Sequence, residues 1–288
     1  MVIFIPGYDA AIPPSDKTMP MRPATAMLLF LLSFSACSPV RKMKESSPST
    51  ADWRPVVAHR GAWKHTGAPQ NSLASLRAAI DMGCHASEFD VHMTADSVLV
   101  INHDPTHAGM RVQHTGYAEL STVKLKNGEP LPLLRDFLST GSKHPATRLV
   151  LEIKPSTRGR EWADATVRRT VALVREMKAE GLVTYICFDY GMLLELLRID
   201  PAAKAQYLNG DKSATELKAD RMEGADYNHA VYTRRPGLID SLKKESLVVN
   251  VWTVNDSTLM DTFLKAGVDM VTTDEPERLF RLLKAGKR

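Results

Sequence analysis

The sequence contains little cysteine, with three cysteines in 288 residues. A small scaffold held together by several disulfides is therefore excluded. Cys84 and Cys187 stand far apart in the chain, each among apolar neighbours, so we expect two buried thiols. A single disulfide between them stays an alternative in an oxidising compartment. The third cysteine, Cys37, lies near the N-terminus and belongs to a different context, which is described below.

The sequence also lacks a strong charge of either sign. Its 37 lysines and arginines nearly balance 33 acidic residues, giving a formal net charge of +4. The basic residues are scattered, with Arg41-Lys42 and Arg234-Arg235 as the densest pairs, which is typical of a solvated surface and does not indicate a nucleic-acid partner. There is no internal repeat and no low-complexity tract. A hydrophobic content of 44% indicates an ordinary globular protein.

The apolar run Ala26–Leu32 is too short to span a bilayer comfortably. It follows a basic segment that begins at Met21-Arg22 and precedes Ser33–Cys37, an arrangement that indicates an export signal. The segment resembles a bacterial lipoprotein signal in which Cys37 becomes the acylated first residue, although Phe34 replaces the usual leucine. An ordinary secretory signal with an incidental cysteine is the alternative. Initiation at Met19 or Met21 is preferred.

This signal divides the chain into three parts. Residues 1–37 comprise upstream sequence and a signal peptide ending at Cys37, residues 38–54 form a polar tether, and residues 55–288 form one domain. We expect an exported protein, anchored by lipid to a bacterial membrane and facing the periplasm. A soluble periplasmic protein is the alternative.

From residue 55 onward, apolar strand-like runs alternate with helix-like segments, which indicates a parallel α/β protein. The predicted strands are Val56–Ala58, Glu88–Met93, Val98–His103, Leu149–Ile153, Thr184–Phe188, Ala205–Leu208, Ala225–Tyr227, Leu247–Thr253 and Met270–Thr273. The predicted helices are Asn71–Met82, Trp162–Glu180, Met192–Ile199, Gly237–Lys244, Leu259–Ala266 and Glu277–Leu283. The length suits a barrel of eight strand–helix units, which needs roughly 250 residues.

Nine predicted strands are one too many for such a barrel. The two runs Glu88–Met93 and Val98–His103 are joined by only four residues, too few for a helical crossover. They form a hairpin-like excursion, or the second is a strand outside the barrel. The following segment, Pro105–Pro132, lacks periodicity and is interpreted as an insertion over the mouth of the barrel.

Carboxylates recur on the predicted strands with a spacing of two. Glu88 and Asp90 therefore point to one face, and the same holds for Glu152 and Lys154. Three inward carboxylates without a nearby cysteine suit a hard cation such as Mg²⁺ or Ca²⁺ rather than zinc. The alternative is that Glu88 and Asp90 form ion pairs with Arg60 and Lys154 without a metal.

Two histidines, His59 and His103, follow strand-like runs at the positions where a barrel presents acid/base residues. His92 shares the parity of Glu88 and Asp90, but no second motif supports it. The remaining histidines are interpreted as loop or surface residues; they are His65, His85, His107, His114, His144 and His229.

Several segments together resemble the glycerophosphodiester phosphodiesterase family. The segments are Ala58-His59-Arg60-Gly61, Pro69-Gln70-Asn71-Ser72, Glu88-Phe89-Asp90-Val91, His103-Asp104, Leu151-Glu152-Ile153-Lys154, Val251-Trp252-Thr253-Val254-Asn255 and Gly267–Asp274. The resemblance covers residues 55 to about 285 and implies a TIM barrel, here with a short insertion after the second-strand region. One departure stands out, because Gln70 occupies a position where the family usually has glutamate. Its loss of charge puts the metal and substrate preference in question.

The resemblance also implies a role for each motif residue. Glu88, Asp90 and Glu152 would bind one divalent cation, either Mg²⁺ or Ca²⁺. His59 and His103 would be the acid/base pair, while Arg60 and Lys154 would hold phosphate oxygens. Trp252 would line the substrate cleft, with a core tryptophan as the alternative.

The implied activity is hydrolysis of glycerophosphodiesters to glycerol 3-phosphate and an alcohol. The expected partner is thus a small-molecule substrate, with no nucleic acid, and with membrane contact only through the lipid anchor. Phospholipase-type cleavage of an intact phospholipid in the same barrel is an alternative. A non-catalytic lipoprotein that binds phosphodiesters is another.

Overall fold

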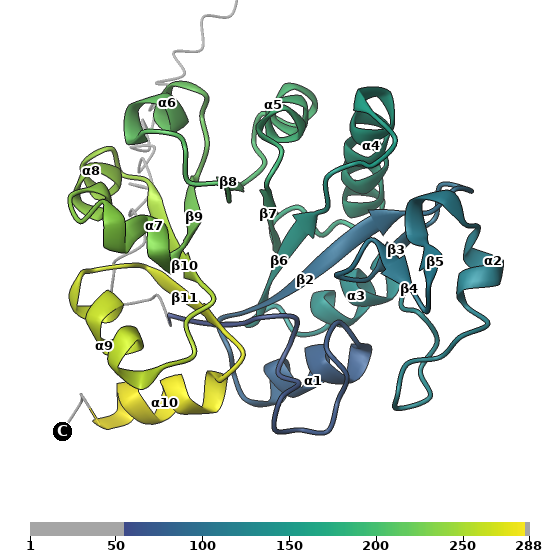
Figure 1. Cartoon of the computed structure of the whole chain (residues 1–288), viewed down its shortest axis with the longest axis horizontal. Coiled ribbons are helices and arrows are strands. Elements are labelled where there is room, and N and C mark those ends of the chain that lie inside the picture. The colour runs from purple at the N-terminus through teal and green to yellow at the C-terminus, as the bar shows by residue number, and fades with distance from the viewer. Residues whose placement is uncertain (1–54, 286–288) are drawn as a thin grey trace, which may run out of the picture. The chain divides into compact units, whose positions relative to one another are not determined.

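The computed structural model describes residues 55–285, which contain a closed barrel of parallel strands (Figure 1). The eight barrel strands are β1 (Val56–Ala58), β2 (Ala86–Met93), β6 (Arg148–Ile153), β7 (Val183–Cys187), β8 (Ala205–Tyr207), β9 (Gly224–Asn228), β10 (Val248–Trp252) and β11 (Met270–Thr273). They follow one another around the barrel in chain order, and β1 closes it by pairing in parallel with both β11 and β2. The predicted TIM barrel is confirmed.

Helices surround these strands as an outer layer (Figure 1). They are α1 (Leu73–Asp81), α3 (Leu134–Ser142), α4 (Arg160–Glu176), α5 (Tyr190–Ile199), α6 (Ala214–Ala219), α7 (His229–Arg234), α8 (Leu238–Lys244), α9 (Ser257–Lys265) and α10 (Pro276–Ala285). Polar side chains fix several helix starts. The Ser72 hydroxyl accepts a hydrogen bond from the Ser75 amide, and Asp189 and Asp256 cap α5 and α9 in the same way.

The strands bury both of their faces, one against the helices and one inside the barrel. On β2, Phe89 and Val91 point outward into the large core between strands and helices. Ala86 points inward and joins a small apolar cluster with Val57 and Val150 inside the barrel. Because successive side chains alternate, Glu88 and Asp90 share the inward face with Ala86. The predicted parity of the two carboxylates is therefore confirmed.

The ninth predicted strand lies outside the barrel. β3 (Leu99–Ile101) pairs antiparallel with β2, with Val91 opposite Ile101. The two strands thus form a hairpin, and β3 is an addition at the C-terminal end of β2. This arrangement carries the chain past the end of β2 and places His103 directly after β3.

The insertion after β3 has structure of its own that the sequence pattern did not predict. It contains β4 (Thr106–His107), β5 (Met110–Arg111), the 3₁₀ turn η2 (Val112–His114) and α2 (Tyr117–Leu120). A small separate core joins it to β3 through Val100, Val112 and Leu120. No residue of the insertion lines the central cavity described below, so the insertion borders the barrel mouth instead of covering it.

Cys84 and Cys187 are free and buried, as predicted. Within residues 55–285, no helix combines the length and apolar character needed to cross a membrane. The predicted signal peptide, Cys37 and the tether lie outside the described residues.

Candidate active site

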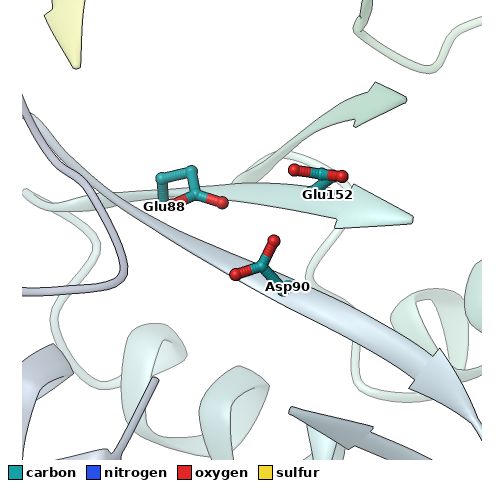
Figure 2. A group of neighbouring side chains, drawn as sticks. All are labelled: Glu88, Asp90 and Glu152. Atoms are coloured by element: carbon teal, nitrogen blue, oxygen red, sulfur yellow. The ribbon is translucent and has the colours of Figure 1, made fainter. Parts of the chain in front are cut away.

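Three carboxylates meet inside the barrel, at the C-terminal ends of β2 and β6. The two strands are neighbours, and Asp90 lies in register with Glu152. One oxygen from each of Glu88, Asp90 and Glu152 lies within 4.8 Å of the others (Figure 2). All three side chains are buried, with residue exposures of 3%, 1% and 7%. Hard oxygen donors that converge in this way suit a divalent cation such as Mg²⁺ or Ca²⁺.

Burial and mutual repulsion act strongly on these carboxyl groups. Burial, together with the charges of Asp90 and Glu152, raises the pKa of Glu88 well above its usual range. Burial and the charge of Asp90 raise the pKa of Glu152 to about 7. Burial also acts to raise the pKa of Asp90, but Lys154, His103 and other neighbours outweigh it and lower the pKa. Burial and repulsion therefore oppose ionisation of Glu88 and Glu152, whereas the neighbours of Asp90 favour its ionised form.

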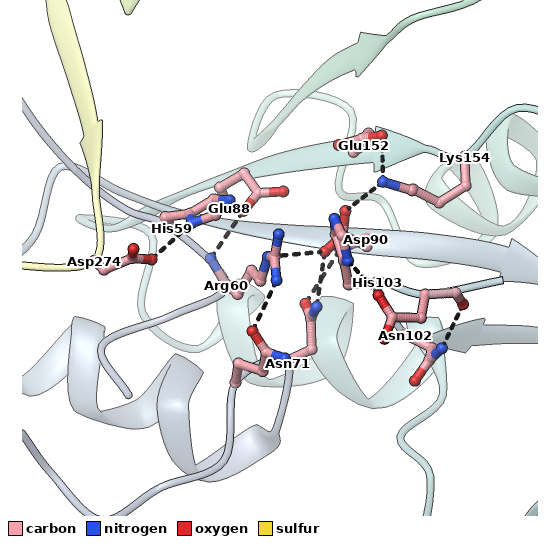
Figure 3. A network of polar contacts seen from close by, with 12 residues as sticks. His59, Arg60, Asn71, Glu88, Asp90, Asn102, His103, Glu152, Lys154 and Asp274 are labelled. Carbon is pink, nitrogen blue, oxygen red and sulfur yellow. Dashed lines mark hydrogen bonds and ion pairs between the residues drawn. The ribbon is translucent and has the colours of Figure 1, made fainter. Parts of the chain in front are cut away.

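Two cations contact the carboxylate cluster (Figure 3). Lys154 Nζ lies 2.7 Å from Glu152 Oε1 and 3.2 Å from Asp90 Oδ1. Arg60 Nε lies 3.8 Å from Asp90 Oδ2, and the Arg60 amide donates to Glu88 Oε2 at 2.8 Å. The predicted alternative of ion pairs is thus present in part. It does not exclude a metal, because three carboxylates converge and, among residues 55–285, Lys154 and Arg60 are the lysine and arginine side chains that pair with them.

His59 stands at the end of β1 and is oriented by a carboxylate from the end of β11. Its Nδ1 lies 2.7 Å from Asp274 Oδ1. A carboxylate can only accept, so Nδ1 carries the proton and Nε2 is left free to exchange one. His59 Nε2 lies 4.0 Å from Glu88 Oε2, which places it beside the carboxylate cluster.

Asp274 is itself held in place by Asn255. Asn255 Nδ2 donates to Asp274 Oδ2 at 2.8 Å, and the Asp274 amide donates to Asn255 Oδ1 at 2.8 Å. Burial acts to raise the pKa of Asp274, but the hydrogen bond and charge of His59 prevail and lower it. Asp274 is thus an ionised acceptor that fixes the tautomer of His59.

His103 reaches the same cavity from the loop after β3. Its Nδ1 lies 2.7 Å from Oδ1 of Asp104, and its side chain is 35% exposed. Partial burial lowers the pKa of His103, assisted by Lys154 and Arg60 and opposed by Asp90 and Asp104. The two histidines therefore share one arrangement, with Nδ1 bonded to a carboxylate and Nε2 available.

The Pro69–Ser72 motif organises the carboxylates from the loop before α1. Asn71 adopts a left-handed backbone conformation with φ of 58°. Its Nδ2 donates to Asp90 Oδ2 at 2.7 Å, and its Oδ1 accepts from the Asp90 amide. Gln70 is exposed, and its Oε1 accepts from Arg60 Nη1 at 2.8 Å. Gln70 thus orients Arg60 and makes no hydrogen bond to the carboxylate cluster.

One cavity collects most of the predicted site residues. Its lining includes His59, Arg60, Glu88, His103, Glu152, Lys154 and Trp252, while Asp90 lies buried between them. The far wall is apolar and contains Phe188 and Leu208. Trp252 packs edge-to-face on Phe188 at 5.5 Å between ring centroids, and its Nε1 donates to the Asp226 carbonyl. Trp252 therefore forms a wall of the cavity and is held in place by a ring contact and a hydrogen bond.

Four residues of the site were not predicted from the sequence. Asn71, Asn255 and Asp274 lie inside motifs that were noted, but a motif does not show which side chain bonds to which. Asp226 lines the cavity floor, and burial raises its pKa well above the usual range. No motif contains Asp226, and only its inward position on β9 distinguishes it.

Two further histidines are buried, and one of them was predicted to be a loop or surface residue. His107 is buried, and its Nε2 donates to the Val123 carbonyl at 3.0 Å, so its interpretation as a loop or surface residue is wrong with respect to burial. His92 is buried as well, and burial lowers its pKa to about 4. His92 Nε2 lies 3.4 Å from the His103 carbonyl, and Gln113 Nε2 donates to His92 Nδ1. His92 thus supports the loop that carries His103.

Comparison with known proteins agrees with this geometry. The sequence profile of the Glycerophosphoryl diester phosphodiesterase family matches residues 59–278. A solved glycerophosphodiester phosphodiesterase from Parabacteroides distasonis is 38% identical, with a TM-score of 0.79, and the match covers 81% of this chain and 98% of that one. A glycerophosphodiester phosphodiesterase from Caldanaerobacter subterraneus subsp. tengcongensis is 28% identical over 80% of this chain and 98% of the relative.

A further solved structure shares the fold at lower identity. It is a phosphodiesterase from Oleispira antarctica, 23% identical with a TM-score of 0.70 over 81% of this chain and 98% of that one. That protein was solved in complex with the product sn-glycerol-3-phosphate.

Proposed function

Since the chain belongs to the glycerophosphodiester phosphodiesterase family, we propose that it hydrolyses glycerophosphodiesters to glycerol 3-phosphate and an alcohol, using one divalent cation and two histidines. The observation that carries the proposal is the buried carboxylate cluster between His59 and His103. The product found in the Oleispira antarctica phosphodiesterase supports the same product class.

Glu88, Asp90 and Glu152 would hold the cation, either Mg²⁺ or Ca²⁺. When bound, it would offset negative charge on a phosphate oxygen as the transition state forms. Arg60 and Lys154 lie on the same cluster and bind the remaining phosphate oxygens. A guanidinium and an ammonium around one phosphate supply the positive charge that the diester requires.

The two histidines divide the proton transfers. Each has Nδ1 fixed by a carboxylate and Nε2 free, so one takes a proton from the nucleophile and the other protonates the departing alkoxide. The nucleophile is the neighbouring hydroxyl of the glycerol, which gives a cyclic phosphate that water then opens, or water directly. The intramolecular route has the advantage of a large effective molarity. Detection of a cyclic phosphate among the early products distinguishes the two.

The test is turnover of a soluble glycerophosphodiester by the wild type and by His59→Ala and Glu88→Ala variants. Removal of an acid/base group costs about 10²- to 10⁴-fold in rate, and we expect losses of this size. His144→Ala is the matched control, because His144 is exposed and outside the cavity. A chelator should also abolish turnover, and added Mg²⁺ or Ca²⁺ should restore it. Near-normal turnover by His59→Ala or Glu88→Ala would contradict the assignment.

Soluble diesters are favoured over intact phospholipids as substrates. Within residues 55–285, Val123 and Leu194 are the large hydrophobic side chains that are exposed, at 39% and 41%. Two separated side chains do not make an apolar surface able to enter a bilayer. Comparison of glycerophosphocholine with phosphatidylcholine vesicles tests this preference. Metal binding without turnover of any diester would instead support a non-catalytic binding protein.

We further propose that the protein is exported and anchored by lipid at Cys37. The proposal rests on the basic, apolar and small-residue segments that end at this cysteine. Labelled palmitate should enter the wild type and not Cys37→Ser, which should appear in the soluble fraction. Equal labelling of both would contradict the proposal.

A further inference from the structure

A second groove adjoins the central cavity. One wall is the loop before α1, with Trp63, Lys64 and Gln70, and the other consists of insertion residues Val123–Lys126. The floor is the segment Asn102–Ala108. His103 lines both the groove and the central cavity, so the two adjoin at this side chain. We propose that the groove binds the departing alcohol of the diester and selects alcohols that carry an additional negative charge.

The position of His103 indicates the direction in which the alcohol leaves the central cavity. This inference rests on the proposed function, in which one histidine protonates the departing alkoxide. Trp252 is on β10, three strands from β2 around the barrel, whereas His103 follows β3, which pairs with β2. Trp252 lines the central cavity on its own side, and the groove adjoins the cavity at His103. The alcohol that passes His103 enters the groove, and His103 Nε2 is then the group that protonates it.

The groove is a built structure with fixed walls. Asn102 Nδ2 donates to the carbonyls of Asp104 and Thr106 and thereby fixes the floor. His107 Nε2 donates to the Val123 carbonyl and ties the floor to the insertion wall. The insertion wall is also tied to the start of α1, because Glu129 accepts from the Leu73 amide at 3.0 Å and from the Ala74 amide at 3.2 Å.

The charges around the groove are unbalanced. Lys64 lies 2.5 Å from Glu275, and Asp104 is bonded to His103. Glu129 is engaged by the first amides of α1, where a negative charge also stabilises the helix dipole. Lys124 and Lys126 are exposed on the groove wall, and neither takes part in an ion pair found among residues 55–285. Their two ammonium groups therefore remain available to a ligand.

The excess of positive charge in the groove identifies the class of alcohol that it would bind. A choline or ethanolamine group brings a positive charge toward Lys124 and Lys126 and gains nothing from them. A phosphorylated polyol brings a negative charge and is attracted by both lysines. Because both side chains are exposed and screened by salt, we expect the preference to be about tenfold at low ionic strength and to shrink as salt is added.

The test compares two substrates that differ by one phosphate, glycerophosphoinositol and glycerophosphoinositol 4-phosphate. The wild type should show the higher kcat/KM for the phosphorylated substrate by about tenfold at low salt. The double variant Lys124→Gln/Lys126→Gln should reduce this ratio to about one. Lys143→Gln/Lys244→Gln is the matched control, because both lysines are exposed and lie outside the groove.

The outcomes separate this inference from the proposed function. Equal kcat/KM for the two substrates in the wild type would overturn the inference and leave the proposed function intact. A preference that survives in Lys124→Gln/Lys126→Gln would overturn it equally. Failure of a folded, metal-loaded protein to hydrolyse either substrate would overturn the proposed function, and the inference with it.

Discussion

At the scale of the residue, the two histidines make the same contact in different surroundings. The Nδ1–carboxylate distance is 2.7 Å in both pairs. The side chains of His59 and Asp274 are 17% and 18% exposed, whereas Asp104 is 69% exposed. Water competes with the exposed carboxylate for its histidine far more than with the sheltered one. The two carboxylates should therefore contribute unequally to catalysis.

We expect Asp274→Asn to lower kcat about 10³-fold, because the amide no longer enforces the tautomer that leaves Nε2 of His59 free. Asp104→Asn should lower it less than about tenfold, since solvent can replace the exposed carboxylate. Steady-state kinetics on one diester, with circular dichroism to verify folding, measure both. Equal losses of kcat in Asp274→Asn and Asp104→Asn would show that burial of the carboxylate does not determine its contribution to catalysis.

Gln70 stands where the resemblance to the family leads us to expect glutamate. Gln70→Glu should change kcat/KM by less than about fivefold, because the side chain is exposed and contacts Arg60 instead of the carboxylate cluster. The apparent metal affinity of Gln70→Glu should also change by less than about fivefold. Titration of activity against Mg²⁺ and Ca²⁺ measures both quantities, and a change above about fifty-fold would show that this position tunes the metal directly.

At the scale of the element, strand positions were predictable because the barrel strands are short apolar runs that alternate with helix-like segments, and several of them end at polar motifs. The extra strand was also predictable as a non-barrel element, because four residues cannot contain a crossover helix. α3 was missed because it contains serine, threonine and glycine and has no side-chain cap. Its helix depends on tertiary packing, including Phe137 against Phe89 at 4.7 Å.

The site was predictable in its residue types and less so in its contacts. Parity placed Glu88, Asp90, Glu152 and Lys154 on inward faces without reference to any other protein. The bond between His59 and Asp274 joins residues 215 positions apart, and no local pattern specifies such a pair. The α6 start was overlooked although Ser213 and Glu216 form a capping box that the sequence displays.

Strand pairing within the barrel makes Gly224 sensitive to substitution. A Cβ atom at this position of β9 would overlap the Val248 carbonyl oxygen of β10, which is backbone and cannot move aside. We expect Gly224→Ala to lower the free energy of unfolding by about 3 kcal/mol, measured by urea denaturation.

Gly237→Ala provides the control for that experiment. Gly237 has helical backbone angles at the start of α8, and a Cβ there would meet no atom within 4 Å. The substitution should leave stability unchanged or raise it by up to about 1 kcal/mol. Equal destabilisation by both variants would show that the overlap with β10 is not the cause.

At the scale of the whole molecule, the carboxylate cluster couples stability to pH and to metal. The pKa of Glu152 is raised to about 7 in the folded protein, above its ordinary value of 4.5. In the metal-free protein, its contribution to stability is complete below pH 4.5 and is lost as the pH rises through about 7. A bound cation would reverse this trend, because it would bind the deprotonated carboxylates in competition with protons.

The increase in Tm caused by Mg²⁺ or Ca²⁺ should therefore be larger at a pH of about 8 than at about 5.5. Thermal unfolding with the cation and with a chelator, at both pH values, measures the difference. Glu152→Gln removes one titrating ligand and should weaken both the metal effect and its pH dependence. A metal effect of equal size at both pH values would contradict the expected competition between protons and the cation.

The pairing of β1 with β11 has a consequence for the synthesis of the molecule. His59 follows the first barrel strand and Asp274 the last, so their contact forms only when the barrel closes. A chain truncated after β10 has two open strand edges, which are prone to aggregation. It also lacks Asp274, the carboxylate that orients His59. A chain truncated in this way should therefore show little or no hydrolase activity.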